Sequence, residues 1–347
     1  MTTPQATTSP PARALIVKPS SLGDVITAVP VLRGLRRSFP RAHLAWLLDE
    51  RFADVIAHDS DLDEAIIYQR PWLTEPRQLS KLLKRLRAEK FDWTIDLQGL
   101  MRSAMLTLAT GAPLRAGWVS PREPLSRPAY NRHIRPTAEH VVDQNIQLTR
   151  SLGIDARGED FTLEVSSRGG ESASRICSEW KLSYGQFVAA VPPTRWATKQ
   201  YPVRHWRKVV AELARSRPVV ILGSPSRSER ELCAAIAADQ SPRVSDLCGS
   251  TTVDEMVGMI AASGAVVCAD SAAQYIAPAV GVPVVSIAGP TRPRRTGPYR
   301  LGRTVAADVP CRGCLRRSCD HTSCMQLIDP KRIVRAVEEM AAANRAL

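Results

Sequence analysis

A strand–helix–strand unit is written most clearly near the end of the chain, in Val266-Val267-Cys268-Ala269-Asp270-Ser271-Ala272-Ala273-Gln274-Tyr275-Ile276-Ala277-Pro278-Ala279-Val280-Gly281-Val282-Pro283-Val284-Val285-Ser286-Ile287-Ala288-Gly289-Pro290-Thr291. Its apolar runs predict a buried strand, a tight turn, a short helix and a second buried strand before a Gly-Pro-Thr turn. The helix begins at Asp270-Ser271-Ala272-Ala273, whose small side chains leave the backbone N–H groups bare. Such a helix start favours a phosphate or pyrophosphate. Taken alone, the segment also fits an ordinary βαβ unit with a capped helix.

A second turn of this kind lies near the other end of the chain, in Leu15-Ile16-Val17-Lys18-Pro19-Ser20-Ser21-Leu22-Gly23-Asp24-Val25-Ile26. An apolar strand leads into it, and an amphipathic run continues to about Arg37. Gly23 permits a strained turn, and Asp24 falls at the mouth of the following helix. This is the carboxyl edge of the expected sheet, where ligands of open α/β sheets bind. The position makes Asp24 the best candidate for a general base, and a simple helix cap is the alternative.

The first half of the chain alternates apolar runs with helical periods, and 347 residues fit two domains of ordinary size. Strands are expected at Leu15–Val17, Leu44–Leu48, Ala65–Tyr68 and Trp93–Ile95, and helices at Asp24–Arg37, Phe52–His58, Leu79–Lys90 and Val141–Leu152. Residues 111–136 are rich in Pro, Arg and Ser and are expected to form loops over the site.

A second series of strands and helices follows the polar stretch Ser166–Glu171, which is the expected domain boundary. Strands are expected at Phe187–Val191, Val219–Leu222 and before Asp270, and helices around Trp206, from about Ser228 and around Met256. The repeated βα units predict an α/β protein with two Rossmann-like, doubly wound parallel sheets.

Composition limits the classes of function. The apolar fraction is 44%, and no apolar run approaches the 18–20 residues of a membrane span. Residues 1–13 read as a loose tail without a signal peptide, so a cytoplasmic protein is expected. The net charge of +13 indicates an acidic partner, with the basic residues gathered at 33–41, 77–90 and 292–303. Aromatic residues are only 5% and do not interleave with these clusters, which argues against nucleic acid. A phosphorylated glycolipid on an anionic inner-membrane surface fits the charge better.

The cysteines fall into two groups. Cys177, Cys233, Cys248 and Cys268 are scattered and are expected to be buried small hydrophobes. Cys311, Cys314, Cys319 and Cys324 form a cluster with His321 among them, and its CxxC spacing fits a structural zinc site. A reduced or partly disulfide-linked loop is the alternative, and in either case the loop is expected to be structural.

Several segments together resemble the heptosyltransferase family of lipopolysaccharide core biosynthesis, glycosyltransferase family 9. Besides the two turns above, the segment from Ile95 to Ala104 is similar to the family's Asp-x-Gln-Gly-x-x-(Lys/Arg)-Ser-Ala motif. Further matches, in the family's order, are Arg122-Glu123-Pro124 with Tyr130-Asn131-Arg132 (most typical of the type I enzymes), Thr194 with Thr198-Lys199 and Trp206, and Gly289-Pro290-Thr291 with Thr296-Gly297-Pro298-Tyr299.

The resemblance implies the GT-B fold, with the active site in the cleft between two Rossmann-like domains. The implied domains are 14–168 for the acceptor and 169–329 for the nucleotide sugar, the latter including the cysteine-rich loop 311–324. The final helix, 330–347, is then expected to pack on the N-terminal domain. The implied activity is inverting transfer of a heptose, or a similar sugar, from ADP-heptose to a lipopolysaccharide core-type acceptor, without a required cofactor.

The resemblance also implies roles for particular residues. Asp24 occupies the position of the proposed base. The implied acceptor-binding residues are Ser20, Ser21, Gly23, Gln98, Arg102 and Arg122, and the implied donor-binding residues are Thr194, Thr198, Lys199, Asp270, Ser271, Ala272, Ala273 and Tyr275. Lys199 could also be a simple surface lysine. Two departures stand out, because the family usually has glycine where this chain has Ala272 and histidine where it has Tyr275.

Two other classes of function remain as alternatives. One is a sugar-nucleotide epimerase on the same fold, although such enzymes lack the paired Ser-Ser-Leu-Gly-Asp and Asp-x-Gln-Gly motifs. The other is a non-catalytic binding protein, either a degenerate family member or a basic, zinc-bearing nucleic-acid binder. Ala272 and Tyr275 favour degeneracy, whereas Asp24 and Lys199 oppose it.

Overall fold

The computed structural model describes residues 9–69 and 75–345. The chain divides into two compact units, Met1–Phe161 and Thr162–Leu347. Residues 1–8 of the expected N-terminal tail lie outside the described residues. The tail was expected to extend to residue 13, but Arg13 already begins the first strand.

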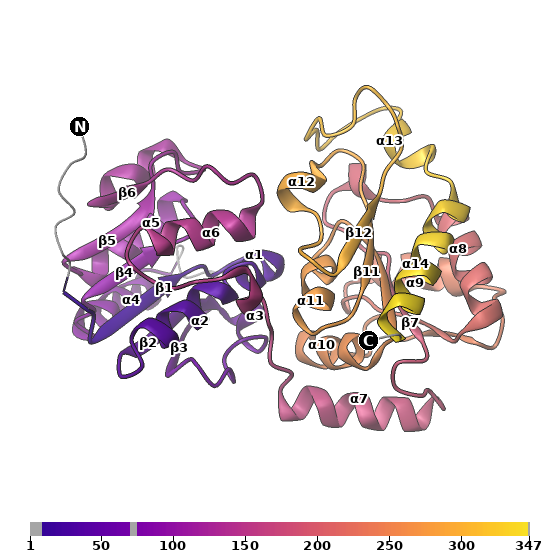
Figure 1. Ribbon diagram of the computed structural model, residues 1–347, viewed down its shortest axis with the longest axis horizontal. Helices are drawn as coiled ribbons and strands as arrows, with labels where there is room; N and C mark the ends of the chain where they lie inside the picture. The colour runs from indigo at the N-terminus through magenta and orange to yellow at the C-terminus, as the bar shows by residue number, and fades with distance from the viewer. Residues whose placement is uncertain (1–8, 70–74, 346–347) are drawn as a thin grey trace. The chain divides into compact units, whose positions relative to one another are not determined.

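The first unit is built on a six-stranded parallel sheet (Figure 1). Its strands are β1 (Arg13–Val17), β2 (His43–Asp49), β3 (Glu64–Tyr68), β4 (Trp93–Asp96), β5 (Leu114–Trp118) and β6 (Arg132–Ile134). Its helices are α1 (Leu22–Ile26), α2 (Val29–Ser38), α3 (Glu50–Ala53), α4 (Pro76–Ala88), α5 (Met101–Thr110) and α6 (Val141–Arg150), with short 3₁₀ helices η1 (Pro124–Ala129) and η2 (Gly158–Asp160).

The second unit is built on another six-stranded parallel sheet. Its strands are β7 (Val188–Val191), β8 (Val219–Ile221), β9 (Val244–Asp246), β10 (Ala265–Ala269), β11 (Val284–Ile287) and β12 (Gly302–Val305). Its helices are α7 (Ser167–Glu179), α8 (Val203–Ser216), α9 (Arg227–Ala237), α10 (Val253–Ala262), α11 (Ala273–Ala279), α12 (Pro293–Thr296), α13 (Ser323–Gln326) and α14 (Pro330–Arg345), with the 3₁₀ helix η3 (Ala197–Lys199).

The two sheets share one topology. The strand order is β3-β2-β1-β4-β5-β6 in the first and, read from its other edge, β9-β8-β7-β10-β11-β12 in the second. Each chain path therefore starts in the middle of its sheet, moves to one edge, and returns to fill the other side. This confirms the two doubly wound Rossmann-like sheets expected from the sequence. The order reverses between β1 and β4 and between β7 and β10, and ligands of such sheets bind at these switch points.

Apolar strands form the core of each unit. Leu15 and Val17 of β1 pack with Ala45 and Leu47 of β2 in the first unit, and all four are buried. In the second unit Trp206 on α8 is fully buried in an apolar cluster. Parallel strands covered on both faces need such continuous apolar runs, which is why these strands could be predicted from the sequence.

The single helix expected over Asp24–Arg37 is two helices. α1 ends at Ile26, and α2 begins at Val29 with Pro30 in its first turn. Proline cannot donate the hydrogen bond that would continue a preceding helix, but it fits the first turn of a new one. Gly23 lies inside α1 rather than in a strained turn. The helix expected over Phe52–His58 is also replaced, by the short α3 followed by turns.

Residues 111–136, expected to be loops, contain β5 and β6 and complete the first sheet. The boundary expected at residues 168–169 falls between Phe161 and Thr162. Ser166 caps α7 by accepting a hydrogen bond from the Gly169 N–H at 2.8 Å, so the polar stretch there begins a helix. Gly258 of α10 comes so close to the Gly169 carbonyl that a Cβ could not fit, which explains the close packing of α7 on α10.

The C-terminal helix α14 packs inside the second unit. Its buried residues, including Ile333 and Val337, belong to the core of the second unit, where the helix packs on α8 and against β10–β12. Its buried residues therefore pack within its own unit, and the expectation that the helix packs on the N-terminal domain stays a prediction. Among the described helices, none is both long and apolar enough to cross a bilayer.

Candidate functional site

Asp24 lies in the first turn of α1, at the switch point of the first sheet. Its Oδ2 accepts hydrogen bonds from the backbone N–H and the hydroxyl of Ser21, at 3.1 and 3.0 Å. Its Oδ1 lies 3.8 Å from the Lys18 ammonium group. The side chain is about one-third exposed, at 33%. Asp24 thus caps the helix through Oδ2. The same hydrogen bonds hold its Oδ1 in a fixed direction.

Lys18 directly follows β1, and it is only 6% exposed. Its Nζ donates to the Leu97 carbonyl at 2.8 Å, which fixes the ammonium group between β1 and β4. Burial lowers the pKa of Lys18, and Arg122 lowers it further, while Asp24 and Asp96 act in the opposite direction. Burying an ammonium group in this way costs free energy unless the group has a function or a hydrogen-bonding partner.

The pKa of Asp24 is held below its usual value. Burial acts to raise it, but the positive charges of Lys18 and Arg122 and the two Ser21 hydrogen bonds outweigh that effect. The carboxylate is therefore ionised at neutral pH and able to accept a hydrogen bond or a proton.

The Asp96-x-Gln98-Gly99 motif builds the neighbouring turn at the end of β4. Asp96 is fully buried, and its Oδ1 accepts from the backbone N–H groups of Gln98 and Gly99 at 2.8 and 3.1 Å. Tyr130 donates to its Oδ2 at 2.8 Å. Gly99 has φ +67, and a Cβ there would press against Trp118 and Pro121, so glycine is required. Asp96 is thus a structural residue that shapes the turn beside Asp24.

Three further expected acceptor-binding residues surround this turn. Arg102, on α5, donates to the Ser20 hydroxyl at 3.3 Å. Its Nε and the Oε1 of Gln98 are buried without a hydrogen-bond partner among the described residues. Arg122 is exposed and near enough to lower the pKa values of Asp24 and Lys18. Buried polar atoms without partners are rare and mark places where a polar ligand can bind.

Asp270 organises a second cluster, at the switch point of the second sheet. Its Oδ2 lies 3.2 Å from the Lys199 ammonium group and accepts a short hydrogen bond from the Thr291 hydroxyl. Its Oδ1 accepts from the Gln274 amide at 2.8 Å, and its backbone carbonyl accepts from the Thr194 hydroxyl at 3.1 Å. One buried carboxylate therefore joins residues that follow β7, β10 and β11.

Lys199 is not a simple surface lysine. It is 15% exposed, is paired with Asp270, and lies over the Trp196 ring at 4.4 Å from the ring centre. An ammonium group has three N–H donors, so the pair with Asp270 leaves donors for an anion. Lys199 lies beside the start of α11, and the positive charge there matches the negative charge of a diphosphate.

Ser271, Ala272 and Ala273 form the turn after β10 and the first residue of α11. Their backbone N–H groups donate no backbone hydrogen bond among the described residues, and the Ser271 hydroxyl is buried without a partner. The hydroxyl of Tyr275 donates to the Thr296 carbonyl at 2.7 Å. Tyr275 therefore holds the segment after β11 in place, a structural contact made where the family usually has histidine.

Thr198 is engaged within the second unit, and its expected role in donor binding stays a prediction. It is buried, and its hydroxyl donates to the Arg316 carbonyl at 2.8 Å. This contact ties the Lys199 segment to the cysteine-rich loop. A pocket of about 180 Å³ lies there, lined by Thr198, Pro290, Cys311, Cys314, Arg316, Cys319, His321, Thr322 and Cys324. The structure therefore brings the four loop cysteines to one cavity.

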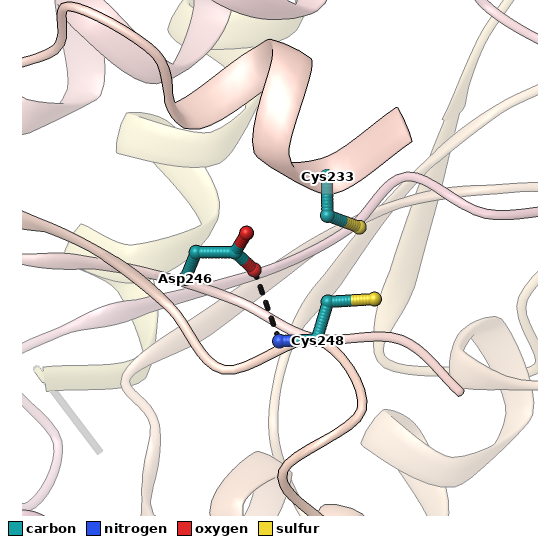
Figure 2. A group of neighbouring side chains, drawn as sticks. All are labelled: Cys233, Asp246 and Cys248. Atoms are coloured by element: carbon teal, nitrogen blue, oxygen red, sulfur yellow. Dashed lines mark hydrogen bonds between the residues drawn. The ribbon is translucent and has the colours of Figure 1, made fainter. Parts of the chain in front are cut away.

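Another cysteine group lies at the end of β8 and β9. Figure 2 shows Cys233, Asp246 and Cys248, whose ligand atoms all lie within 4.8 Å of one another. The Cys248 N–H donates to Asp246 at 3.0 Å. Burial raises the pKa of both thiols, which disfavours the thiolate that a metal needs. Both cysteines belong to the core of the second unit, and the expectation of buried cysteines is confirmed for Cys177, Cys233, Cys248 and Cys268.

Sequence reasoning missed the roles of Lys18, Trp196 and Thr291. Lys18 carried a readable signal, because it is the one charged residue directly after a four-residue apolar run. Thr291 is the last residue of the Gly-Pro-Thr turn. A hydroxyl that follows a buried strand is also a sequence signal for a site residue. The stacking of Lys199 on Trp196 has no comparable signature.

Comparisons with known proteins identify the family. The model of glycosyltransferase family 9 (heptosyltransferase) matches residues 79–324. The chain is 29% identical to lipopolysaccharide heptosyltransferase 1 of Pseudomonas aeruginosa, over 96% of this chain and 99% of that one.

Two solved structures share the fold. The glycosyl transferase family 9 protein from Veillonella parvula has a TM-score of 0.80 at 19% identity, covering 95% of this chain and 97% of that one. The ADP-heptose lps heptosyltransferase II of E. coli has a TM-score of 0.78 at 23% identity, covering 96% and 99%. The fold is thus the GT-B fold, and the chain belongs to glycosyltransferase family 9, the heptosyltransferases.

Proposed function

We propose that this protein is an inverting glycosyltransferase that moves heptose from ADP-heptose to a lipopolysaccharide core-type glycolipid. The family and the names of its relatives support this substrate pair. The observation that carries the proposal is the position of two chemically distinct clusters at equivalent switch points. The Asp24 cluster offers an ionised carboxylate, and the Lys199–Asp270 cluster offers a cation and bare N–H groups.

Asp24 acts on the acceptor in this proposal. Its Oδ1 accepts the proton of the acceptor hydroxyl while that oxygen attacks the anomeric carbon of the donor. Because its pKa is low, Asp24 takes the proton late, when the hydroxyl has become acidic through bond formation. Arg102, Arg122 and Lys18 provide positive charge for a phosphorylated acceptor, with Ser20, Ser21, Gly23 and Gln98 lining the same turn.

The second cluster acts on the donor. As the new glycosidic bond forms on one face of the sugar, the bond between the anomeric carbon and the diphosphate oxygen breaks on the other. Both electrons leave with the nucleoside diphosphate. Lys199 and the N–H groups of Ser271–Ala273 stabilise this charge, and Thr194 holds Asp270 in place through the latter's backbone carbonyl.

The transfer step itself needs no metal in this proposal. Among the described residues of the diphosphate cluster, Asp270 is the carboxylate, and Lys199, Thr291 and Gln274 already engage it. Magnesium at phosphates usually binds through carboxylates that have free oxygens. Lys199 and the bare N–H groups supply the positive potential instead.

The direct test is transfer by the purified protein from ADP-heptose to heptose-deficient lipopolysaccharide, followed by mass spectrometry of the glycolipid. A parallel panel of nucleotide sugars establishes donor choice by thermal shift and donor hydrolysis. We expect ADP-heptose to give transfer and the largest shift. Binding of a nucleotide sugar without turnover would instead support the degenerate binding protein that Ala272 and Tyr275 suggest. Interconversion of free nucleotide sugars would support the epimerase.

We also propose that the protein works at an anionic membrane surface, from the cytoplasmic side, where its acceptor lies. Part of the basic sequence is not free for this role, because Arg33, Arg36 and Arg37 are paired within the first unit with Asp59, Asp61, Asp63, Asp155 and Asp160. A better candidate for the membrane-binding surface is formed by α5 and η1, which contact one another. Met101, Leu108 and Leu125 are exposed there, close in sequence to Arg102 and Arg122.

Vesicle co-sedimentation tests the surface. Leu125 is 78% exposed, so Leu125→Asp should weaken binding to vesicles that contain phosphatidylglycerol. Leu327→Asp, at an exposed apolar residue of the second unit, is the matched control. Equal binding to purely zwitterionic vesicles, or equal loss in both variants, would contradict the proposal.

A further inference from the structure

We propose that Cys311, Cys314, Cys319 and Cys324 bind one structural Zn²⁺, and that this ion holds the Trp196–Lys199 segment in position. The first part stands on the cysteine loop alone. The second part rests on the proposed function, because it assigns Lys199 to the donor diphosphate.

The four thiols share one cavity but differ in setting. Cys324 lies in α13 and is buried, with Met325, in the core of the second unit. Cys311 and Cys314 are exposed, and Cys319 is half-buried. One fixed, core-anchored ligand and three ligands on a loop form the set of four that structural zinc takes. The spacing of Cys311 and Cys314 fits the short ligand pair of such sites.

The thiols are not yet at coordination distance in the structure. The set of three or more metal-ligand atoms within 4.8 Å, among the described residues, is the Cys233 group of Figure 2 and not the loop. Zinc needs sulfur atoms about 2.3 Å from the ion. Binding would therefore draw the loop sulfurs inward around Cys324, which is how an ion can order the loop.

The cysteine loop has no regular secondary structure of its own, and backbone hydrogen bonds from Gly313 to Gly289 and from Leu315 to Pro290 tie it to the turn after β11. Residues 306–322 form no regular helix or strand between β12 and α13, and loops of this length without structure are uncommon in compact domains. Leu315 is exposed, and so are Arg312, Arg316 and Arg317. Positive side chains beside a site of four thiolates offset its net negative charge and favour the deprotonated cysteines.

His321 is a weaker ligand candidate than the four cysteines. Its Nδ1 accepts a hydrogen bond from the Ser323 N–H at 3.2 Å and lies 2.8 Å from the Ser323 hydroxyl. These contacts hold the entry to α13. The cysteines have no comparable polar role among the described residues, which leaves them as the ligand set.

The loop touches the donor segment through side chains that flank the cysteines. Arg316 accepts the Thr198 hydrogen bond through its carbonyl, and the Arg317 guanidinium lies 4.7 Å from the centre of the Trp196 ring. Lys199 lies over that same ring. Arg316 and Arg317 stand between Cys314 and Cys319, so ordering these two cysteines also orders the contacts to Thr198 and Trp196.

Metal analysis of the intact protein tests the site. The full chain, purified under reducing conditions with zinc supplied and then desalted, should carry one zinc per chain. Cobalt substitution should give the intense absorption of tetrahedral thiolate ligation. Cys314→Ser and Cys319→Ser should each lose the ion, whereas the matched Cys233→Ala/Cys248→Ala variant should keep it.

Several results would overturn the site. They are a metal-free protein, a disulfide within the loop found by mass spectrometry under the same conditions, and zinc retained in both loop variants. Zinc lost only from the Cys233/Cys248 variant would place the ion at the other group. Chelation of the wild-type protein provides a check that needs no substitution. These readouts do not depend on transfer activity, so they stand even if the proposed heptose transfer fails.

Affinity for ADP tests the coupling. Removing the ion from the wild-type protein should weaken ADP binding by about 10- to 100-fold, as expected for loss of a charge-assisted contact. The same treatment should have little further effect on Lys199→Ala. An ADP affinity that is unchanged by zinc removal would overturn the link between the loop and Lys199.

Discussion

The ammonium group of Lys199 lies 3.2 Å from a carboxylate oxygen of Asp270, and the same oxygen accepts a hydrogen bond from Thr291. Lys199 follows β7, and Asp270 follows β10, so the pair spans the switch point of the second sheet. A lysine fixed in this way has lost most of its side-chain freedom before any ligand arrives. That makes it a better anion site than a mobile surface lysine, because less ordering remains to be done on binding.

Lys199→Ala should weaken ADP binding by about 10- to 100-fold, since it removes a charge-assisted contact. It should also leave the Asp270 carboxylate facing the diphosphate without its counter-charge. Lys199→Ala/Asp270→Asn should therefore recover part of the lost affinity. Titration calorimetry on both variants checks this. Wild-type affinity in the single variant would remove Lys199 from the donor site, and additive losses would show that Asp270 acts only in folding.

Asp24→Asn should slow transfer by about 10²- to 10⁴-fold, because general-base catalysis is lost. The amide oxygen can still accept from Ser21, so the cap is largely kept. ADP affinity should not change. Ser21→Ala, which removes only the hydroxyl bond to Asp24, is the control for capping, with a cost of about 0.5–2 kcal/mol in stability. If Asp24→Asn turns over near the wild-type rate, Asp24 is a helix cap and nothing more.

Lys18→Met should move the acidic limb of the pH–rate profile upward. In the wild-type protein the Asp24 carboxyl has a lowered pKa, with Lys18 the foremost cause that opposes burial. Activity that depends on ionised Asp24 is then retained above that low pKa and lost only as the pH falls through it. Without the Lys18 charge the pKa rises, so loss begins at higher pH. Rates measured from pH 4 to 8 test this, with Lys84→Met on exposed α4 as the control for net charge.

Much of the fold could be predicted because its strands are buried on both faces. Leu44–Leu48 and Val266–Ala269 read as unbroken apolar runs, and both are strands. β6 reads Arg-His-Ile and β9 reads Val-Ser-Asp, and such short edge strands carry no pattern to recognise. Their place follows from the neighbouring strand, which supplies the hydrogen bonds, and not from their own residues.

In the candidate site, too, some features could be predicted from the sequence and others could not. The positions of Asp24 and Asp270 could be predicted because Asp270 directly follows an apolar strand and Asp24 lies in the first turn of the helix after one, at the edge where parallel strands end. The partner of Thr198 could not, because Arg316 is far away in sequence and contributes only its backbone carbonyl. Every residue has a backbone carbonyl, so the sequence does not indicate which carbonyl accepts the hydrogen bond. The same holds for Leu97, whose carbonyl fixes the Lys18 ammonium group.

Transfer should proceed at the same initial rate in excess EDTA as with added magnesium. The diphosphate cluster has Lys199 and bare N–H groups for the leaving charge, and its carboxylate Asp270 is already engaged by three side chains. The measurement is ADP release in the first minutes after mixing, before a structural ion can leave the cysteine loop. A slow decline in EDTA that zinc restores belongs to that loop. An immediate collapse that magnesium or manganese reverses would instead require a metal on the diphosphate, and the role of Lys199 as its replacement would be wrong.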